Sequence, residues 1–102
     1  MPSQRLSPGE AYVAIQRILD TSGSIVWTDH ARRRARERTF TAQDVLQVLR
    51  HGSVGPSPEW DGQYQSWKYR IAGCDLDHVP LTLVVAIDES TQAIVLITGH
   101  DD

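Results

Sequence analysis

The spacing of apolar residues changes once along the chain, and this change constrains the fold more than any other feature. Residues 11–19 and 42–49 repeat their apolar side chains at the spacing of one helical face. From residue 64 the period is two, and residues 81–87 and 93–98 are apolar runs rich in β-branched side chains. Helices that precede a block of strands predict an α+β fold, in which N-terminal helices pack on a small antiparallel sheet.

Capping residues divide the first half of the chain into three predicted helices. Ser7, Thr28 and Thr41 can each cap a helix. The first helix is expected to end over residues 20–23 with Gly23 as its C-terminal cap, the second at about Arg38, and the third at residues 51–52. Residues 24–27 are extended or only connecting. Glycine, proline and serine over 52–62 predict a loop. Strands follow over 64–71, 81–87 and 93–98, separated by a loop at 73–80 and a turn at 88–91.

A chain of 102 residues is expected to form one domain over residues 1–102, with an N-terminal helix over 1–23 and helices plus a β-meander over 24–102. Its apolar runs are too short for a transmembrane helix, and no apolar segment follows Met1 as in a signal peptide. The single cysteine, Cys74, excludes an internal disulfide. These features favour a cytoplasmic location.

Charge is distributed unevenly along the chain. The net charge of −3 argues against nucleic acid when it is taken alone. Residues 1–58 carry net +3, however, and residues 59–102 carry net −6. Half of the Lys and Arg residues lie within residues 32–38. This local concentration of arginine could meet phosphate, and the acidic half would repel it.

Three residues of the arginine-rich helix form a candidate site. His30, Arg34 and Arg38 follow one another at i, i+4 and i+8, which places them in one stripe along the helix. Arginine binds phosphate bidentately, and histidine acts as a general acid or base. The stripe therefore suits a phosphodiester and its cleavage. The alternative is a solvated basic helix face, which is the usual role of a charge run.

Three motifs resemble a small bacterial domain family of unassigned function. They are His30-Ala31-x-x-Arg34-x-x-x-Arg38, Thr41-x-x-Asp44-Val45 and Trp67-x-Tyr69-Arg70-Ile71-x-Gly73. The resemblance covers roughly residues 25–99 and leaves the first helix outside. The family is similar in layout to the BrnT, MqsR and RelE/ParE toxins of toxin–antitoxin pairs. Those toxins are α+β proteins, and several of them cleave messenger RNA without a metal.

The resemblance implies a RelE-like layout and a toxin-type, metal-independent endoribonuclease. Arg34 and Arg38 would hold a phosphate, and His30 would act as base or acid. Arg70 and His100 are further candidates. Lys68 and Arg70 alternate with Trp67 and Tyr69, so they are expected on the opposite face of their strand. The alternatives for Arg70 and His100 are an ordinary outward-facing strand residue and a mobile terminus. No cofactor or metal is expected. The expected partners are RNA, including ribosome-bound messenger RNA, and a cognate antitoxin or other protein. The charge asymmetry also allows a homo-oligomer, and no membrane is expected.

A second hypothesis is a non-catalytic binding module, antitoxin-like or immunity-like, whose acidic half docks a basic partner. It has support because toxins of this type are strongly basic, whereas this chain is not. Other residues are weaker candidates. The spacing Asp75-x-Asp77-His78 resembles a metal cluster, but Pro80 and Ala86 break the calcium-loop pattern, so a polar loop is expected. Cys74 is interpreted as a packed or loop thiol, and Trp60 as an interface residue in a loop.

Overall fold

The computed structural model describes residues 4–100 and consists of three helices and six strands. In chain order these are α1 (Pro8–Asp20), β1 (Ser24–Trp27), α2 (Asp29–Arg38), α3 (Ala42–His51), β2 (Ser53–Val54), β3 (Glu59–Asp61), β4 (Ser66–Cys74), β5 (Pro80–Asp88) and β6 (Ala93–His100). The predicted α+β class is confirmed. Met1, where a signal peptide would begin, and Asp101 and Asp102 of the acidic half lie outside the described residues.

The sheet is mixed rather than purely antiparallel. Its strand order is β1-β6-β5-β4-β2, and β3 also pairs with β4. Only the β1–β6 pair among these strands is parallel, with Ser24 opposite Ala93 and Trp27 opposite Leu96. The sequence of the four-residue segment 24–27 does not indicate which strand it pairs with. Its partner strand, β6, lies about seventy residues further along the chain. The segment that was expected to be extended or connecting is therefore an edge strand.

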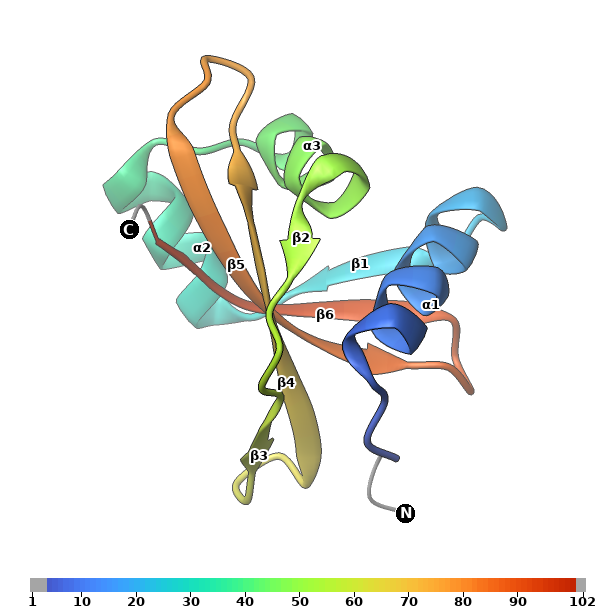
Figure 1. Cartoon of the computed structure of the whole chain (residues 1–102). Coiled ribbons are helices and arrows are strands. Elements are labelled where there is room, and N and C mark those ends of the chain that lie inside the picture. The colour runs from blue at the N-terminus through green and yellow to red at the C-terminus, as the bar shows by residue number, and fades with distance from the viewer. Residues whose placement is uncertain (1–3, 101–102) are drawn as a thin grey trace.

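One hydrophobic cluster holds the helices to the sheet. Figure 1 shows α1 and α3 on the same side of the sheet, and α2 near the end of β6. Ile15 and Ile18 of α1, with Val45 and Leu49 of α3, pack into the same cluster as the β-strand residues Ile71, Leu83, Val85, Ile94 and Leu96. α2 adds Ala31, which is fully buried. Full burial of a valine, leucine or isoleucine side chain, as in this cluster, stabilises the fold by about 1.5–3 kcal/mol.

The predicted helix starts are confirmed. Ser7 with Glu10 and Thr41 with Asp44 form capping boxes, and the Thr28 hydroxyl accepts a hydrogen bond from the Ala31 N–H. The C-terminal cap of α1 differs from the prediction. Ser22, not Gly23, has the left-handed conformation, with φ of 62°. Gly23 is needed for space, because a Cβ there would lie 2.4 Å from Cγ2 of Ile18.

The segment 52–62, predicted as a loop, contains two short strands on one edge of β4. β2 pairs with the C-terminal half of β4, and β3 pairs with its N-terminal half. Pro56 and Pro58 lie between them and have no N–H to donate, so the edge is interrupted there. β4 begins at Ser66, later than predicted, because the Asp61 carboxylate accepts hydrogen bonds from the N–H groups of Gln63 and Tyr64 and holds a turn. No helix within residues 4–100 is long and apolar enough to cross a membrane.

Candidate functional site

One face of the sheet points away from the hydrophobic cluster, and we call it the outer face. Tyr69 and Ile71 of β4 are buried in the cluster, so the alternating residues Lys68 and Arg70 lie on the outer face, as the sequence predicts. β5 contributes Val84 and Ala86, and β6 contributes Val95, Ile97, Thr98 and His100. Basic side chains from β4 and the end of β6 therefore meet over an apolar floor.

A β-bulge at Ile97 decides which face His100 occupies. Val85 pairs with Leu96, but its neighbour Val84 pairs with Thr98, so Ile97 is an extra residue in β6. Strict alternation would place His100 on the same face as the buried Leu96. The bulge instead turns Gly99 toward the core and His100 to the outer face. His100, expected after the last strand, is the final residue of β6.

Thr28 stabilises the bulge. Its N–H donates to the carbonyl oxygen of Leu96 at 3.2 Å. Its hydroxyl is within 3.0 Å of the same carbonyl oxygen and 3.1 Å of the carbonyl oxygen of Ile97, and it accepts from the N–H of Ala31 at 3.0 Å. The residue that caps α2 thus also satisfies backbone carbonyls of β6. The start of the arginine-rich helix is fixed to the strand that carries His100.

Arg70 and His100, two of the predicted site residues, lie in contact. Nη1 of Arg70 is 3.5 Å from Nε2 of His100. Because a guanidinium can only donate, a hydrogen bond between the two side chains forms in the tautomer whose Nε2 accepts. The pair borders a hollow of about 230 Å³ on the outer face. Its other lining residues are Glu59, Lys68, Val84, Ile97 and Thr98.

Two carboxylates of β3 pair with the two cations of this hollow. Nε of Arg70 is 3.4 Å from Oε1 of Glu59, and both side chains are more than half exposed. Nζ of Lys68 is 3.8 Å from Oδ2 of Asp61, and this pair is less exposed. An exposed ion pair such as Arg70–Glu59 contributes about 0–1 kcal/mol, so an incoming phosphate can replace Glu59 at Arg70 at little cost. Glu59 and Lys68 were not predicted as site residues. The alternation of Lys68 with Arg70 along β4 was the available signal.

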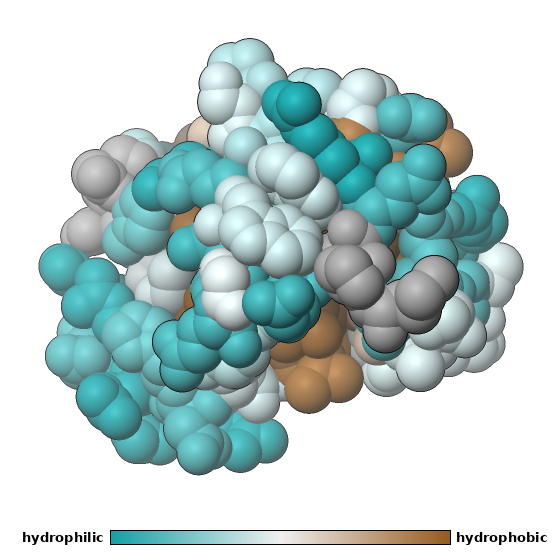
Figure 2. Space-filling view, turned by 90° about the horizontal axis from the view of Figure 1, so that it is seen from below, coloured by the Kyte–Doolittle hydropathy of each residue, from teal (hydrophilic) through white to brown (hydrophobic). Residues whose placement is uncertain are grey.

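The helical stripe is present, because α2 includes His30, Arg34 and Arg38. His30 and Arg38 are exposed and Arg34 is half-buried. Within residues 4–100, the side chains of His30 and Arg34 make no hydrogen bond or ion pair, and no described contact joins these two residues to Arg70. Figure 2 shows a broad hydrophilic area over α2 beside a small apolar area. The arginine-rich helix therefore presents a solvated surface next to β6.

The weaker candidates have structural roles. Oδ1 of Asp75 accepts hydrogen bonds from the N–H groups of Asp77 and Val79, so the metal-like segment is a self-capped polar loop, as expected. Among the described residues no group of three or more His, Cys, Asp or Glu could hold a metal ion. Cys74 is an exposed thiol at the end of β4. Trp60, expected in a loop, lies in β3 and packs edge-on against Trp67, with ring centroids 5.4 Å apart.

The fold and the site together define a small α+β domain with a basic hollow on the outer face of its sheet. A family model described as "Domain of unknown function (DUF4258)" matches residues 27–98, which is more than half of the chain, and the chain belongs to that family. The match leaves α1 outside, as the sequence motifs predict. It includes His30, Arg34, Arg38 and Arg70, and it ends two residues before His100. Neither the curated proteins nor the solved structures include a match to this chain.

Proposed function

We propose that this protein is a metal-independent endoribonuclease of the toxin type, with Arg70 and His100 at its reaction centre. The observation that carries the proposal is the 3.5 Å contact between their side chains at the edge of an exposed basic hollow. An arginine and a histidine that converge on one open surface supply two functions that RNA cleavage uses. The arginine binds the phosphate, and the histidine moves a proton.

The reaction uses the RNA, water and these side chains. Nε2 of His100 accepts the proton of a ribose 2′-hydroxyl, and the 2′-oxygen forms a bond to phosphorus. The bond between phosphorus and the 5′-oxygen breaks, and that oxygen takes a proton from water, which in turn regains a proton from the imidazolium of His100. The products are a 2′,3′-cyclic phosphate and a 5′-hydroxyl. Arg70 turns from Glu59 to the phosphate and stabilises the charge that develops on its oxygens. His30 is the second candidate for acid or base.

The arginine stripe supplies the binding surface in this proposal. Arg34 and Arg38 hold the RNA backbone beside the reaction centre, as phosphate contacts position a nucleic acid without selecting its sequence. We also propose a cytoplasmic location, where messenger RNA is the substrate, free or on the ribosome. A cognate antitoxin or another protein partner then controls the activity in the cell.

The acidic half is a weaker basis for the alternative, a non-catalytic binding module. Glu59, Asp61 and Glu89 are in ion pairs with basic residues of the same chain. Asp75 and Asp88 accept hydrogen bonds from the backbone of their own turns. These carboxylates serve the fold, so the net charge of the acidic half overstates what it offers to a basic partner. This arrangement favours the ribonuclease over the docking module.

Cleavage of labelled single-stranded RNA tests the proposal, both with the RNA alone and with ribosomes that carry it. EDTA is present in the assay with RNA alone. We expect products with cyclic phosphate ends, and a loss of about 10²- to 10⁴-fold in rate for His100→Ala. Arg70→Ala should lose activity as well. His51→Ala, at an exposed position in the last turn of α3, is the matched control. No cleavage in either assay, or equal cleavage by His100→Ala, contradicts the proposal.

A further inference from the structure

A second and larger cavity adjoins the hollow at Arg70 and His100. Its volume is about 590 Å³, and Ile97 lines both spaces. Ala86, Val95 and Ile97 of the outer face form an apolar floor. The turn between β3 and β4 and the turn between β5 and β6 form walls on the cavity. A space of this size, with an apolar floor and polar walls, suits a small planar ligand.

An exposed aromatic side chain stands at the rim of this cavity. Tyr64 is 61% exposed, although its turn is held by the Asp61 carboxylate. Beside it, the Gln65 amide donates to the carbonyl oxygen of Gly62 at 2.8 Å, which fixes the direction of the Gln65 side chain. A ring that is exposed on an ordered turn is available to stack on another ring, and each nucleobase has a π-face for this contact.

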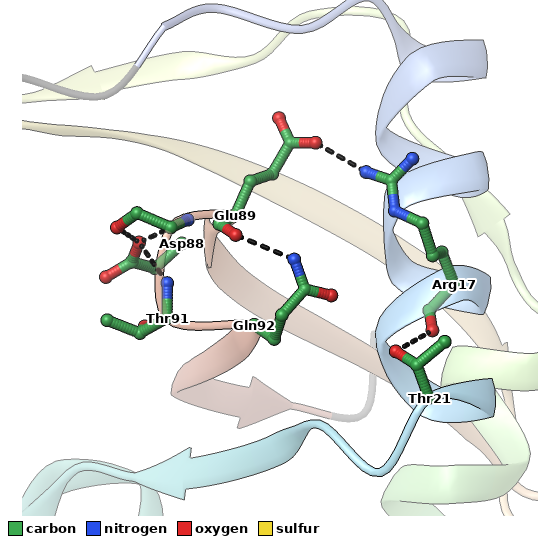
Figure 3. A network of polar contacts seen from close by, with 7 residues as sticks. Arg17, Thr21, Asp88, Glu89, Thr91 and Gln92 are labelled. Carbon is green, nitrogen blue, oxygen red and sulfur yellow. Dashed lines mark hydrogen bonds and ion pairs between the residues drawn. The ribbon is translucent and has the colours of Figure 1, made fainter.

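The larger cavity differs from the basic hollow in the charge of its lining residues. Asp88 and Glu89 line the wall formed by the β5–β6 turn (Figure 3). Hydrogen bonds from the Ser90 and Thr91 side chains lower the pKa of Asp88, so its carboxylate is charged at neutral pH. Glu89 is held by Arg17 at 2.5 Å. A phosphate is repelled from this wall, whereas an uncharged heterocycle is not.

We propose that this cavity binds the nucleobase next to the phosphate at Arg70, and that Tyr64 stacks on that base. The inference rests on the proposed function, because the phosphate at Arg70 sets where the base lies. In this arrangement the basic hollow takes the backbone and the neighbouring cavity takes the base. The enzyme then selects single-stranded RNA, whose bases can be turned outward, over duplex RNA.

Binding of an uncleavable RNA tests the inference apart from catalysis. The probe is a labelled oligonucleotide with 2′-O-methyl groups, measured by fluorescence anisotropy together with a series in which each member lacks one base. We expect one or two abasic positions to weaken binding to the wild type by about fivefold or more. Tyr64→Ala should weaken binding of the intact probe to a similar extent. Its affinity should be the same for the intact probe and for the probes that lack a base at those positions. Tyr64→Phe should bind as the wild type does.

Tyr12→Ala, at an exposed position on α1, is the matched control and should not change binding. If Tyr64→Ala binds the intact probe as well as the wild type does, the inference is wrong, and the cleavage assay still decides the proposed function. If the binding pattern is as expected but no RNA is cleaved, the proposed catalysis fails and the base site stands. If the wild type binds no probe, the base site is wrong, and the cleavage assay with ribosomes decides the proposed function. Thermal unfolding of each variant shows that the fold is retained.

Discussion

The hydroxyl group of Thr28 lies 3.1 Å from the carbonyl oxygen of Ile97, and so joins the start of α2 to the bulge in β6. The two residues are 69 positions apart in the chain. Since Ile97 is the extra residue that turns His100 to the outer face, one side chain connects the placement of the arginine stripe with that of the histidine. The geometry of the proposed site therefore depends on a residue that does not itself belong to it.

Replacement of Thr28 by valine should affect both stability and the site. The variant keeps the shape of the side chain and the backbone hydrogen bond to Leu96, but it loses the hydroxyl that caps α2 and its hydrogen bonds to β6. We expect the free energy of unfolding to fall by about 1–2 kcal/mol, measured in urea. RNA cleavage should fall as well, because the bulge is no longer held. Ser7→Ala removes the cap of α1 and is the control: it should lose similar stability and keep its cleavage rate.

Gly99 should tolerate no side chain. A Cβ there would lie 2.8 Å from Cζ of Phe40 and 3.3 Å from Cδ2 of Leu83. Phe40 cannot move freely, because its ring is stacked on Trp27. Gly99→Ala should therefore lower the free energy of unfolding by about 1–3 kcal/mol. Gly9→Ala, where nothing lies within 4 Å of the added Cβ, should leave stability unchanged or slightly higher. If Gly99→Ala and Gly9→Ala are equally stable, the expected steric clash between a Cβ at residue 99 and the Phe40 ring is wrong.

Asp44 should make stability depend on pH. Its carboxylate accepts from the N–H of Leu76 at 3.0 Å and from Thr41, which ties the β4–β5 loop to α3. The Leu76 N–H is the main cause that lowers the pKa of Asp44 below its ordinary value of 3.8. The unfolded chain therefore binds this proton more tightly, and the stability contribution is lost as the pH falls below about 3.8 toward the pKa of the folded state.

Asp44→Ala should lower the free energy of unfolding by about 1–3 kcal/mol at pH 7, since it leaves the Leu76 N–H without this acceptor. Urea unfolding between pH 7 and pH 3 gives the test. The difference between wild type and variant should narrow in the acidic part of that range, because the Asp44 carboxyl of the unfolded chain takes up a proton near pH 3.8, before that of the folded chain does. A difference that stays constant down to pH 3 would mean that Asp44 does not titrate as described.

Removal of the charge on Glu59 should strengthen RNA binding. Glu59→Gln frees Arg70 from its ion pair and removes a negative charge from the hollow. We expect a rise of about two- to fivefold in affinity for single-stranded RNA at low salt, because an exposed ion pair is worth at most about 1 kcal/mol. Asp20→Asn changes the net charge equally but acts at the pair with Arg50, and it should have little effect. Weaker binding by Glu59→Gln contradicts the role given to the hollow.

The arginine stripe should contribute to binding through phosphate contacts. Arg34→Gln and Arg38→Gln should each reduce the salt dependence of RNA affinity by about 0.7 in the slope of log K against log salt. Arg36→Gln is the matched control, because Arg36 lies on the opposite flank of the helix at 100° per residue. If all three variants behave alike, α2 is only a solvated basic face. That outcome would mean that Arg34 and Arg38 are not part of the RNA-binding site. The cleavage assay would still test the roles of Arg70 and His100.

Local features of the fold were predictable from the sequence, and features that join distant segments were not. The three helix starts follow from Ser7, Thr28 and Thr41, whose side chains act within one helical turn. The parallel pairing of β1 with β6 has no local signal. Neither has the bulge at Ile97, because a period of two gives no sign of an inserted residue.

The candidate site follows the same division. Alternation along β4 placed Arg70 on the face away from Tyr69, and this is confirmed. The contact of Arg70 with His100 depends on the register of three strands and on the bulge, and a sequence pattern does not determine these. Glu59 was not predicted as a site residue, because it lies in a segment whose prolines and glycines predict a loop. Its strand exists because β4 offers an unpaired edge for three residues to join.

The pairing of β1 with β6 also has a consequence for the order of folding during synthesis. Residues 24–28 are synthesised long before residues 93–97, to which their backbone is hydrogen-bonded in the fold. Until β6 has been synthesised, β1 has no strand to pair with. Thr28 can cap α2, but it has no carbonyl group of β6 to bind. Contacts of such sequence separation form late, because the loop between them must close first. The arginine-rich helix of a nascent chain is therefore synthesised before the strand that carries His100 can pair with its neighbours.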